Sequence, residues 1–421
     1  MSFKNKDKGR PGQPKIEHIE LSEKHIKLRW ILVVACLAVA CVAIMTGLFS
    51  VLNKEPGWQE VEASASGPNC SLDFQLHYDF SADGAGATAS YRALSGLYTQ
   101  AVEDGYRIFT QDLLEDGLYN LAYLNAHPNE AVSVDPALFR ALEQIVEAGN
   151  RSIYLAPVYV EYQRIFLSES EEEAALYDPA RNPELADDIR QMASFANDPA
   201  MIDLEIVGQD RVRLKVSGAY LTYAAENEIT EFLDFSWMKN AFIIDYMAQL
   251  LKDNGFTNGY LASYDGFTRN LDERGTVYSF NVFDRLENAV YLPAQMQYDF
   301  PAAIVYLRNY PMSDADRWHY FSFSDGSIAT MMIDSADGMS RSATDNLVCY
   351  STGSGCAEML LRMIPVYIAE DFNTASLEEL KTDGIYSIWS EDRSVCYNDP
   401  SLAIGLTGES DGQEYSLNLI S

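Results

Sequence analysis

Apolar side chains recur along this chain with the spacing of half-buried helices and with the alternation of strands. Four segments are predicted as helices: 94–101, 135–149, 242–255 and 356–367. The second has the clearest boundaries, because Asp135 can cap it, Pro136 suits the first helical position and Gly149 favours a stop. Each of these segments is expected to bury one face against a core.

Strand predictions dominate the second half of the chain. Alternation is clearest where Val212, Leu214 and Val216 are separated by two basic residues, which is typical of a half-buried strand. The predicted strands are 72–78, 212–216, 259–263, 276–283, 303–307, 328–333 and 347–351. Helices and strands are mixed, without an internal repeat. The predicted fold class is therefore α+β, with sheets packed against helices.

One segment has neither pattern, because residues 30–52 form a run of 23 residues without a charge. A helix of that length spans the roughly 30 Å hydrocarbon core of a bilayer. Lys24, Lys27 and Arg29 precede the run and only Lys54 follows it closely. By the positive-inside rule, the N-terminus is predicted to be cytoplasmic and the C-terminal part to lie outside the cell membrane.

Two other interpretations of this run are weaker. A cleaved signal peptide normally has a shorter apolar region and a small-residue cleavage site. A lipoprotein signal would use Cys36 or Cys41, yet eleven uncharged residues of the run continue past Cys41. We therefore predict a single-pass anchor. The predicted organisation is a basic cytoplasmic segment 1–29, a transmembrane helix 30–52, a linker 53–70 and an extracytoplasmic domain 71–421.

Charge supports the same division. The chain has 62 acidic and 30 basic residues, a net charge of −32, but residues 1–29 alone carry +4 and the remainder −36. Such an acidic domain is a poor partner for nucleic acid, whose binding relies on Lys and Arg at the phosphates. The acid run 168–173 is interpreted as a solvated loop or a helix start. With 26 tyrosines and 48% hydrophobic residues, the chain is not a disordered acidic tail.

Cysteine and histidine give no catalytic or metal-binding pattern on their own. Four cysteines lie in the predicted outer domain, where disulfides can form, and three connectivities stay open: the residues are Cys70, Cys349, Cys356 and Cys396. No pair has zinc-site spacing. The outer histidines, His77, His127 and His319, are far apart in sequence and are interpreted as surface or core residues. No nucleophile elbow or phosphate-binding loop occurs.

Four segments, in this order, resemble motifs of a known family. The segment Leu233–Asp245 resembles L-D-x-G-G-x-A-K-G-Y-x-x-D, and Tyr260–Gly266 resembles a strand that ends in Gly-Gly. Met331–Gly338 is similar to H-x-x-D-P-x-T-G, and Ala357–Arg362 is similar to A-D-x-x-S-T. The family is that of the FAD:protein FMN transferases (ApbE-like proteins). Members bind FAD with magnesium and transfer FMN to a threonine of an acceptor protein.

The resemblance implies a site. The implied cofactor-binding residues are Asp234, Lys239, Asn240, Gly266, Asp334 and Gly338, with Glu358 as the implied metal ligand. Other residue types replace several motif residues: Ser236, Trp237 and Asp265 stand for glycines, Asn240 for lysine, Met331 for histidine and Arg362 for threonine. Tryptophan excludes the close backbone approach that glycine allows to a diphosphate. An arginine at a metal position repels the ion.

These replacements decide the functional expectation. We expect a membrane-anchored ApbE-like domain that has lost catalysis and keeps a cleft for flavin or for a partner. Two alternatives stay open. One is an active, magnesium-dependent FMN transferase in which Lys239 and Glu358 rebuild the site, with FAD and an acceptor protein as its partners. The other is a cell-surface interaction module that binds no flavin.

Overall fold

The computed structural model describes Cys36, Val39 and residues 56–65, 70–287, 289–409 and 412–420. The chain divides into two units, Met1–Lys54 and Glu55–Ser421. Of the predicted span 30–52, only Cys36 and Val39 are described, both helical and exposed, and the rest lies outside the described residues. Among the residues that are described, no helix has the length and apolar character to cross a bilayer. The anchor stays a prediction.

The second unit alternates helices and strands, as the sequence predicts. The described helices are α2 (Ala87–Phe109), α3 (Leu121–Ala126), α4 (Pro136–Glu147), α5 (Ala156–Leu167), α6 (Glu171–Tyr177), α7 (Pro183–Asn197), α8 (Gly218–Glu226), α9 (Lys239–Asp253), α10 (Cys356–Tyr367) and α11 (Thr374–Thr382). The first strands are β1 (Trp58–Val61), β2 (Phe74–Asp79), β3 (Ala131–Ser133), β4 (Ile202–Ile206), β5 (Arg211–Val216), β6 (Gly259–Ser263), β7 (Phe267–Asn270), β8 (Tyr278–Leu286) and β9 (Ala289–Tyr298). The later strands are β10 (Ala302–Arg308), β11 (Tyr320–Ser322), β12 (Ile328–Thr330), β13 (Asn346–Ser351), β14 (Tyr386–Glu391), β15 (Ser394–Tyr397), β16 (Ala403–Glu409) and β17 (Ser416–Leu419).

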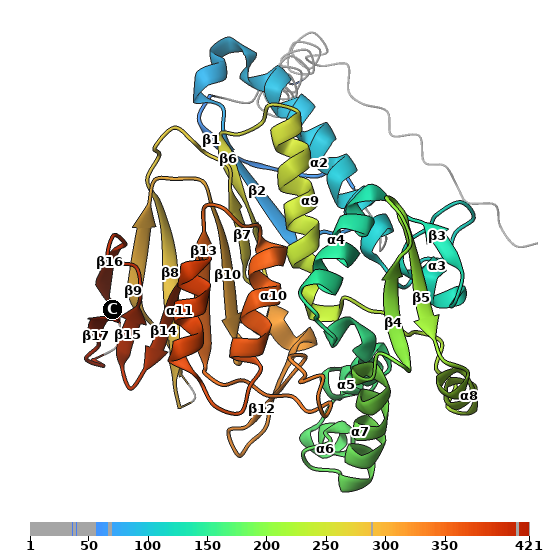
Figure 1. Cartoon of the computed structure of the whole chain (residues 1–421). Helices are drawn as coiled ribbons and strands as arrows, with labels where there is room; N and C mark the ends of the chain where they lie inside the picture. The colour runs from blue at the N-terminus through green and yellow to red at the C-terminus, as the bar shows by residue number, and fades with distance from the viewer. Residues whose placement is uncertain are drawn as a thin grey trace, which may run out of the picture. The chain divides into compact units, whose positions relative to one another are not determined.

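Three layers organise most of this unit (Figure 1). Among the described residues, the central layer is a nine-stranded sheet in the order β1-β2-β6-β7-β10-β13-β14-β15-β17, antiparallel except for the parallel pair β15–β17. The helices α2, α9, α10 and α11 pack against one face of it. The smaller sheet β16-β9-β8 covers part of the other face. This arrangement confirms the predicted mixed α+β class.

Strand β10 lies at the middle of these layers, and all seven of its residues are buried. Its side chains alternate between two cores, since Val305 and Leu307 join the core under the helices while Ile304 and Tyr306 join the core between the sheets. A strand covered on both faces has no solvated side. The run 303–307 is continuously apolar for this reason.

A helical segment with a second small sheet, β3-β5-β4, separates α2 from α9 in the sequence. Its helix boundaries follow the expected chemistry, because the Asp135 carboxylate accepts the Ala137 N–H at 2.7 Å and caps α4. The acid run 168–173 contains a helix start, where the Ser170 hydroxyl accepts the Glu173 N–H at 3.2 Å. Helix α4 packs against α2 and α10, which joins this segment to the layers.

Two expectations are changed by the structure. Part of the predicted linker 53–70 is β1, which pairs with β2 as an edge strand; its polar sequence hid it, because edge pairing uses backbone groups rather than an apolar face. The cysteines described in the outer unit, Cys70, Cys349, Cys356 and Cys396, are free thiols. The last three are buried, so they pack as small apolar side chains.

The turn between β6 and β7 brings the chain unusually close to β10. Gly266 has a φ of +108°, and its carbonyl oxygen accepts the Tyr306 N–H at 2.9 Å. A Cβ atom at this position would lie 2.4 Å from the Tyr306 carbonyl oxygen. Only glycine fits both the conformation and the space.

Replacing Gly266 by alanine is therefore expected to destabilise the fold twice over, by about 1–2 kcal/mol for the left-handed conformation and by about 1–3 kcal/mol for the backbone contact. Gly275→Ala is the matched control, because Gly275 has a φ of +76° and nothing within 4 Å of an added Cβ. Urea unfolding of the full-length chain, followed by tryptophan fluorescence, measures both losses. Equal losses would contradict the close approach of β10.

Candidate ligand cleft

Two adjoining hollows, of about 450 Å³ and about 400 Å³, open beside the β6–β7 turn. They share five lining residues, and we call the combined space the cleft: Asp73, Asn240, Asp265, Trp318 and His319. These residues come from the start of β2, the first turn of α9, the β6–β7 turn and the loop 311–319 that follows β10. Segments far apart in the sequence thus meet at one place.

The centre of the cleft is a hydrogen-bonded pair, Asn240 and Asp265. The Asn240 amide Nδ2 donates to Asp265 Oδ2 at 2.8 Å. This contact fixes the amide orientation, because an ionised carboxylate only accepts hydrogen bonds. Asn240 Oδ1 and Asp265 Oδ1 are both shielded from water and have no hydrogen-bond donor among the described residues. Burial raises the pKa of Asp265, partly offset by its hydrogen bonds and by nearby His319.

A buried ion pair holds the loop 311–319 over the cleft. Arg308, which is 4% exposed, donates through its guanidinium Nη2 to Asp316 Oδ1 at 2.8 Å. The other Asp316 oxygen accepts the backbone N–H groups of Met312 and Ser313 at 2.6 and 3.0 Å. This carboxylate therefore ties the loop to the end of β10. Trp318 and His319 come soon after Asp316 in the chain, so the ion pair also restricts their positions.

The second hollow extends toward Asp234 and Lys239. Asp234 is buried and accepts the Ser236 N–H at 2.7 Å, and burial raises its pKa while nearby Lys239 opposes that shift. Ser236 has a φ of +48°. That left-handed conformation is the one glycine favours, and glycine stands at this position in the family motif. The backbone turn of the motif is present without its glycine.

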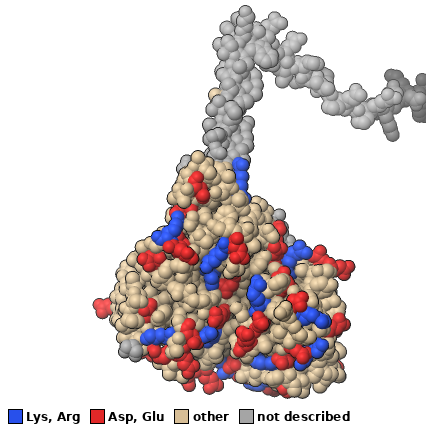
Figure 2. All heavy atoms as spheres, turned by 45° about the horizontal axis from the view of Figure 1, so that its top comes forward, with Lys and Arg blue, Asp and Glu red and all other residues tan. Residues whose placement is uncertain are grey.

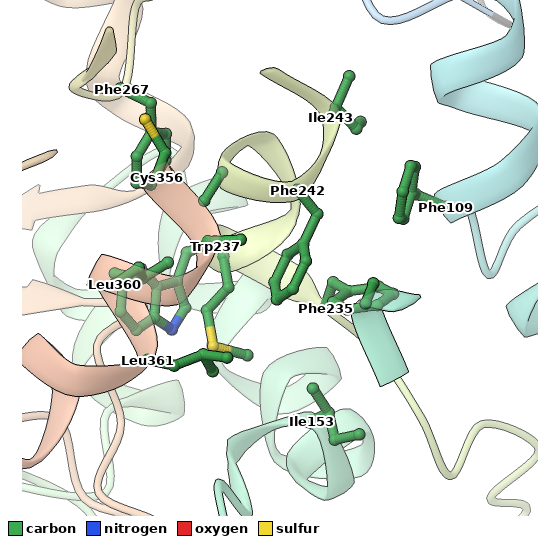
Figure 3. Packing of buried hydrophobic residues seen from close by; sticks show 14 of the residues in the cluster. Phe109, Ile153, Phe235, Trp237, Phe242, Ile243, Phe267, Cys356, Leu360 and Leu361 are labelled. Atoms are coloured by element: carbon green, nitrogen blue, oxygen red, sulfur yellow. The ribbon is translucent and has the colours of Figure 1, made fainter. Parts of the chain in front are cut away.

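Trp237 occupies the next motif position, where the family has a second glycine, and its side chain packs in the core. Figure 3 shows Trp237 packed beside Phe242 of α9 and Leu360 and Leu361 of α10. It is buried, and it also lines the second hollow. The tryptophan at this motif position is thus a core residue that also forms part of the cleft wall.

Another motif residue, Asp245, connects three elements beside the cleft. Its carboxylate accepts the N–H groups of Cys356 and Ala357 at 3.0 and 2.9 Å, which caps the N-terminus of α10. It also forms an ion pair with Arg269 of β7 at 3.0 Å. A Cβ atom at Gly355 would lie 2.4 Å from the Asp245 carboxylate. The last aspartate of the motif therefore has a structural partner.

Of the residues that the family resemblance implies, the structure brings four to the cleft: Asp234, Lys239, Asn240 and Gly266. The other three lie elsewhere. Asp334 pairs with Arg341 at 3.2 Å and accepts the Ala336 N–H, so the loop 334–338 closes on itself. Gly338, with a φ of +75°, packs against Ile189 of α7.

Glu358 lines a separate hollow with residues of α4 and α11. It pairs with Arg362 at 3.0 Å, and Arg362 also bonds Asp383. Within the described part of the chain, no three acidic, histidine or cysteine side chains gather as a metal would require. The cofactor and metal assignments of all seven residues stay predictions.

The sequence did not indicate three residues of the cleft: Asp73, Trp318 and His319. His319 lies in the second hollow together with Met331, which stands where the family motif has histidine. An imidazole thus reaches this region from a different loop. No local spacing could reveal it, because Asp265 and His319 are separated by two strands of the nine-stranded sheet and two strands of the sheet β16-β9-β8.

This three-layer arrangement has counterparts among solved structures. The ApbE protein of Thermotoga maritima matches with a TM-score of 0.52, covering 80% of this chain and 93% of that one at 11% identity. The chain has an ApbE-like fold. A variant of the flavin transferase ApbE of Vibrio cholerae also aligns, with a TM-score of 0.49 and 10% identity over 84% of this chain and 98% of that one. No family model and no curated protein matches the sequence.

The Arg308–Asp316 ion pair, which holds the loop 311–319, can be tested by mutation. Asp316→Ala is expected to lower the free energy of unfolding by about 3–5 kcal/mol, because it leaves Arg308 buried without its counter-charge. The control is Asp187→Ala, which removes an exposed pair with Arg190 and is expected to cost about 0–1 kcal/mol. Urea unfolding of the full-length chain compares the two. A small loss in both variants would show that the loop does not depend on the pair.

Proposed function

We propose that the chain is a membrane-anchored, extracytoplasmic ApbE-like domain that binds a small ligand in the cleft and does not transfer FMN. The observation that carries this proposal is the Asn240–Asp265 pair, which puts a carboxylate and an amide where the family motifs have glycine and lysine. A cleft of this size is typical of small-ligand sites. The ligand, however, has to suit a different set of chemical groups.

The charges lining the cleft disfavour a diphosphate. The hollows contain the carboxylates of Asp73, Asp112, Asp234, Asp265 and Asp316. Against them stand Lys239, His319 and Arg308, and Arg308 is already paired with Asp316. A diphosphate is normally bound by cations or by exposed backbone N–H groups. On the face drawn in Figure 2, acidic and basic side chains are interspersed.

Magnesium does not fit the residues that would have to hold it. The ion prefers an octahedron of oxygen ligands, and Glu358 is the only carboxylate that the resemblance assigns to it. Glu358 is paired with Arg362, whose positive charge stands where the family has a hydroxyl. Without the ion, the pyrophosphate bond has no electrophile to polarise it. We therefore derive no FMN-transfer step for this chain.

The proposed location at the membrane, with the C-terminal unit outside, rests on the sequence alone. The uncharged run 30–52 is long enough to span a bilayer, and the basic residues lie on its N-terminal side. In this proposal the acidic unit that contains the cleft faces outward.

The functional proposal is tested with the full-length chain, FAD, magnesium and an acceptor protein that carries the threonine motif. We expect no FMN on the acceptor by fluorescence of the denatured protein, and no change in FAD fluorescence on titration. The flavin transferase ApbE of Vibrio cholerae, assayed in parallel, is the positive control. Flavin on the acceptor would overturn the proposal.

The location is tested separately on membranes from cells that make the full-length chain. We expect the protein to stay with the membrane after an alkaline wash, because a spanning helix is not held by charge. Protease added from outside is expected to remove the C-terminal unit and spare an N-terminal tag. Release by the wash, or a protected C-terminal unit, would contradict the anchor.

A further inference from the structure

We propose that the cleft binds an amidinium or guanidinium cation, held by the Asp265 carboxylate and the carbonyl oxygen of Asn240. This inference rests on the proposed function, since it names the class of ligand for the same cleft. It departs from the diphosphate ligand of the family. Three features of the cleft support this ligand class: unpaired acceptors, aromatic walls and the local charge.

The unpaired atoms at the centre of the cleft are acceptors. Asn240 is 8% exposed, and its Oδ1 has no donor among the described residues. Asp265 Oδ1 is in the same situation, while the hydrogen bond between the two residues keeps their side chains together. Buried acceptors without donors are costly. A ligand that carries adjacent N–H groups satisfies both, and amidinium and guanidinium present such pairs in one plane.

Aromatic surface surrounds this pair. Tyr264 is 61% exposed and Trp318 is 51% exposed, and both line the first hollow with Phe280 and Phe283. The structure contains a guanidinium on one of these rings, because Arg317 lies over Trp318 at 4.6 Å from the ring centre. Planar cations stack on aromatic faces in this way. The walls therefore suit the flat body of the same ligand.

Charge distinguishes a cation from a neutral ligand of the same shape. Asp73 and Asp265 line both hollows, and among the described residues His319 is the only basic side chain that lines both; Lys239 and Arg308 each line one, and Arg317 lies over Trp318. Their carboxylates favour a bound positive charge. A neutral amide offers N–H donors without that attraction, and a quaternary ammonium offers charge without donors. A primary ammonium has both charge and donors, but amidinium and guanidinium place adjacent N–H donors and the charge in one plane.

Binding is expected to depend on pH, because burial raises the pKa of Asp265. The groups that face this carboxyl are the Ser263 hydroxyl, His319, Asn240, Asp73 and the phenol of Tyr320. The cation pairs with the ionised carboxylate, so affinity rises as pH rises through the pKa of Asp265.

The experiment compares three probes on the full-length chain by ligand-observed NMR: benzamidine, benzamide and benzyltrimethylammonium. Benzamidine is expected to bind at least about tenfold more tightly than the other two. Its affinity is expected to increase as pH rises through the raised pKa of Asp265, while the probe keeps its charge and the affinity of benzamide stays flat. Asp265→Asn is expected to lower benzamidine affinity at least about tenfold. Asp187→Asn, on the exposed face of α7, is the matched control and is expected to bind as the parent chain does.

Equal binding of benzamide and benzamidine would overturn the proposal, as would an Asp265→Asn variant that binds benzamidine normally. If that variant does not fold, the pH profile of the parent chain decides, and a flat benzamidine profile overturns the proposal. FAD is titrated in the same samples. If neither FAD nor benzamidine binds, the proposed ligand class is wrong, but the proposal that the chain does not transfer FMN is unaffected. Binding of FAD, together with flavin on an acceptor, removes the proposed function itself.

Discussion

The carboxylate of Asp245 joins three elements on which the cleft depends. It projects from α9, caps α10 through two backbone N–H groups and pairs with Arg269 of β7. These contacts set α9 against the sheet, and the first turn of α9 carries Asn240 to the β6–β7 turn. Gly355 leaves the space that the carboxylate occupies. The position of the Asn240–Asp265 pair is therefore a consequence of helix capping, which requires no ligand.

Local chemistry made much of this fold predictable. The helix 356–367 and the strand 259–263 have the predicted bounds, because each has an apolar pattern that its surroundings do not override. Strand β8 was predicted as 276–283, but its sheet partners β9 and β16 and the edge strand β1 were not, since their places depend on partners elsewhere in the chain. A short stretch of sequence shows the alternating pattern that predicts a strand, but it does not show which other strand will pair with it.

Only those parts of the site that belong to short continuous segments of the sequence could be predicted. Asn240 and Gly266 belong to motifs whose backbone geometry persists, and the positive φ of Ser236 shows this where the glycine itself is missing. His319 and Trp318 reach the cleft through the loop that Asp316 fastens to Arg308. This buried ion pair could not be predicted from the spacing of residues in the sequence. Four of the seven residues that the family pattern implies line the cleft, whereas the chemistry of the cleft followed only from the assembled side chains.

The pairing of β2 with β6 has a kinetic consequence. Phe74 lies opposite Ser263, so the two strands cannot meet until the long helical segment between them has been made. Closing so large a loop costs entropy before any contact compensates for it, which slows folding. Until then the newly made chain presents β2 with an unpaired edge and an apolar face, including Leu76. A chain delivered across a membrane during synthesis would thus need protection over this interval, and β2 is the segment that a chaperone would have to cover.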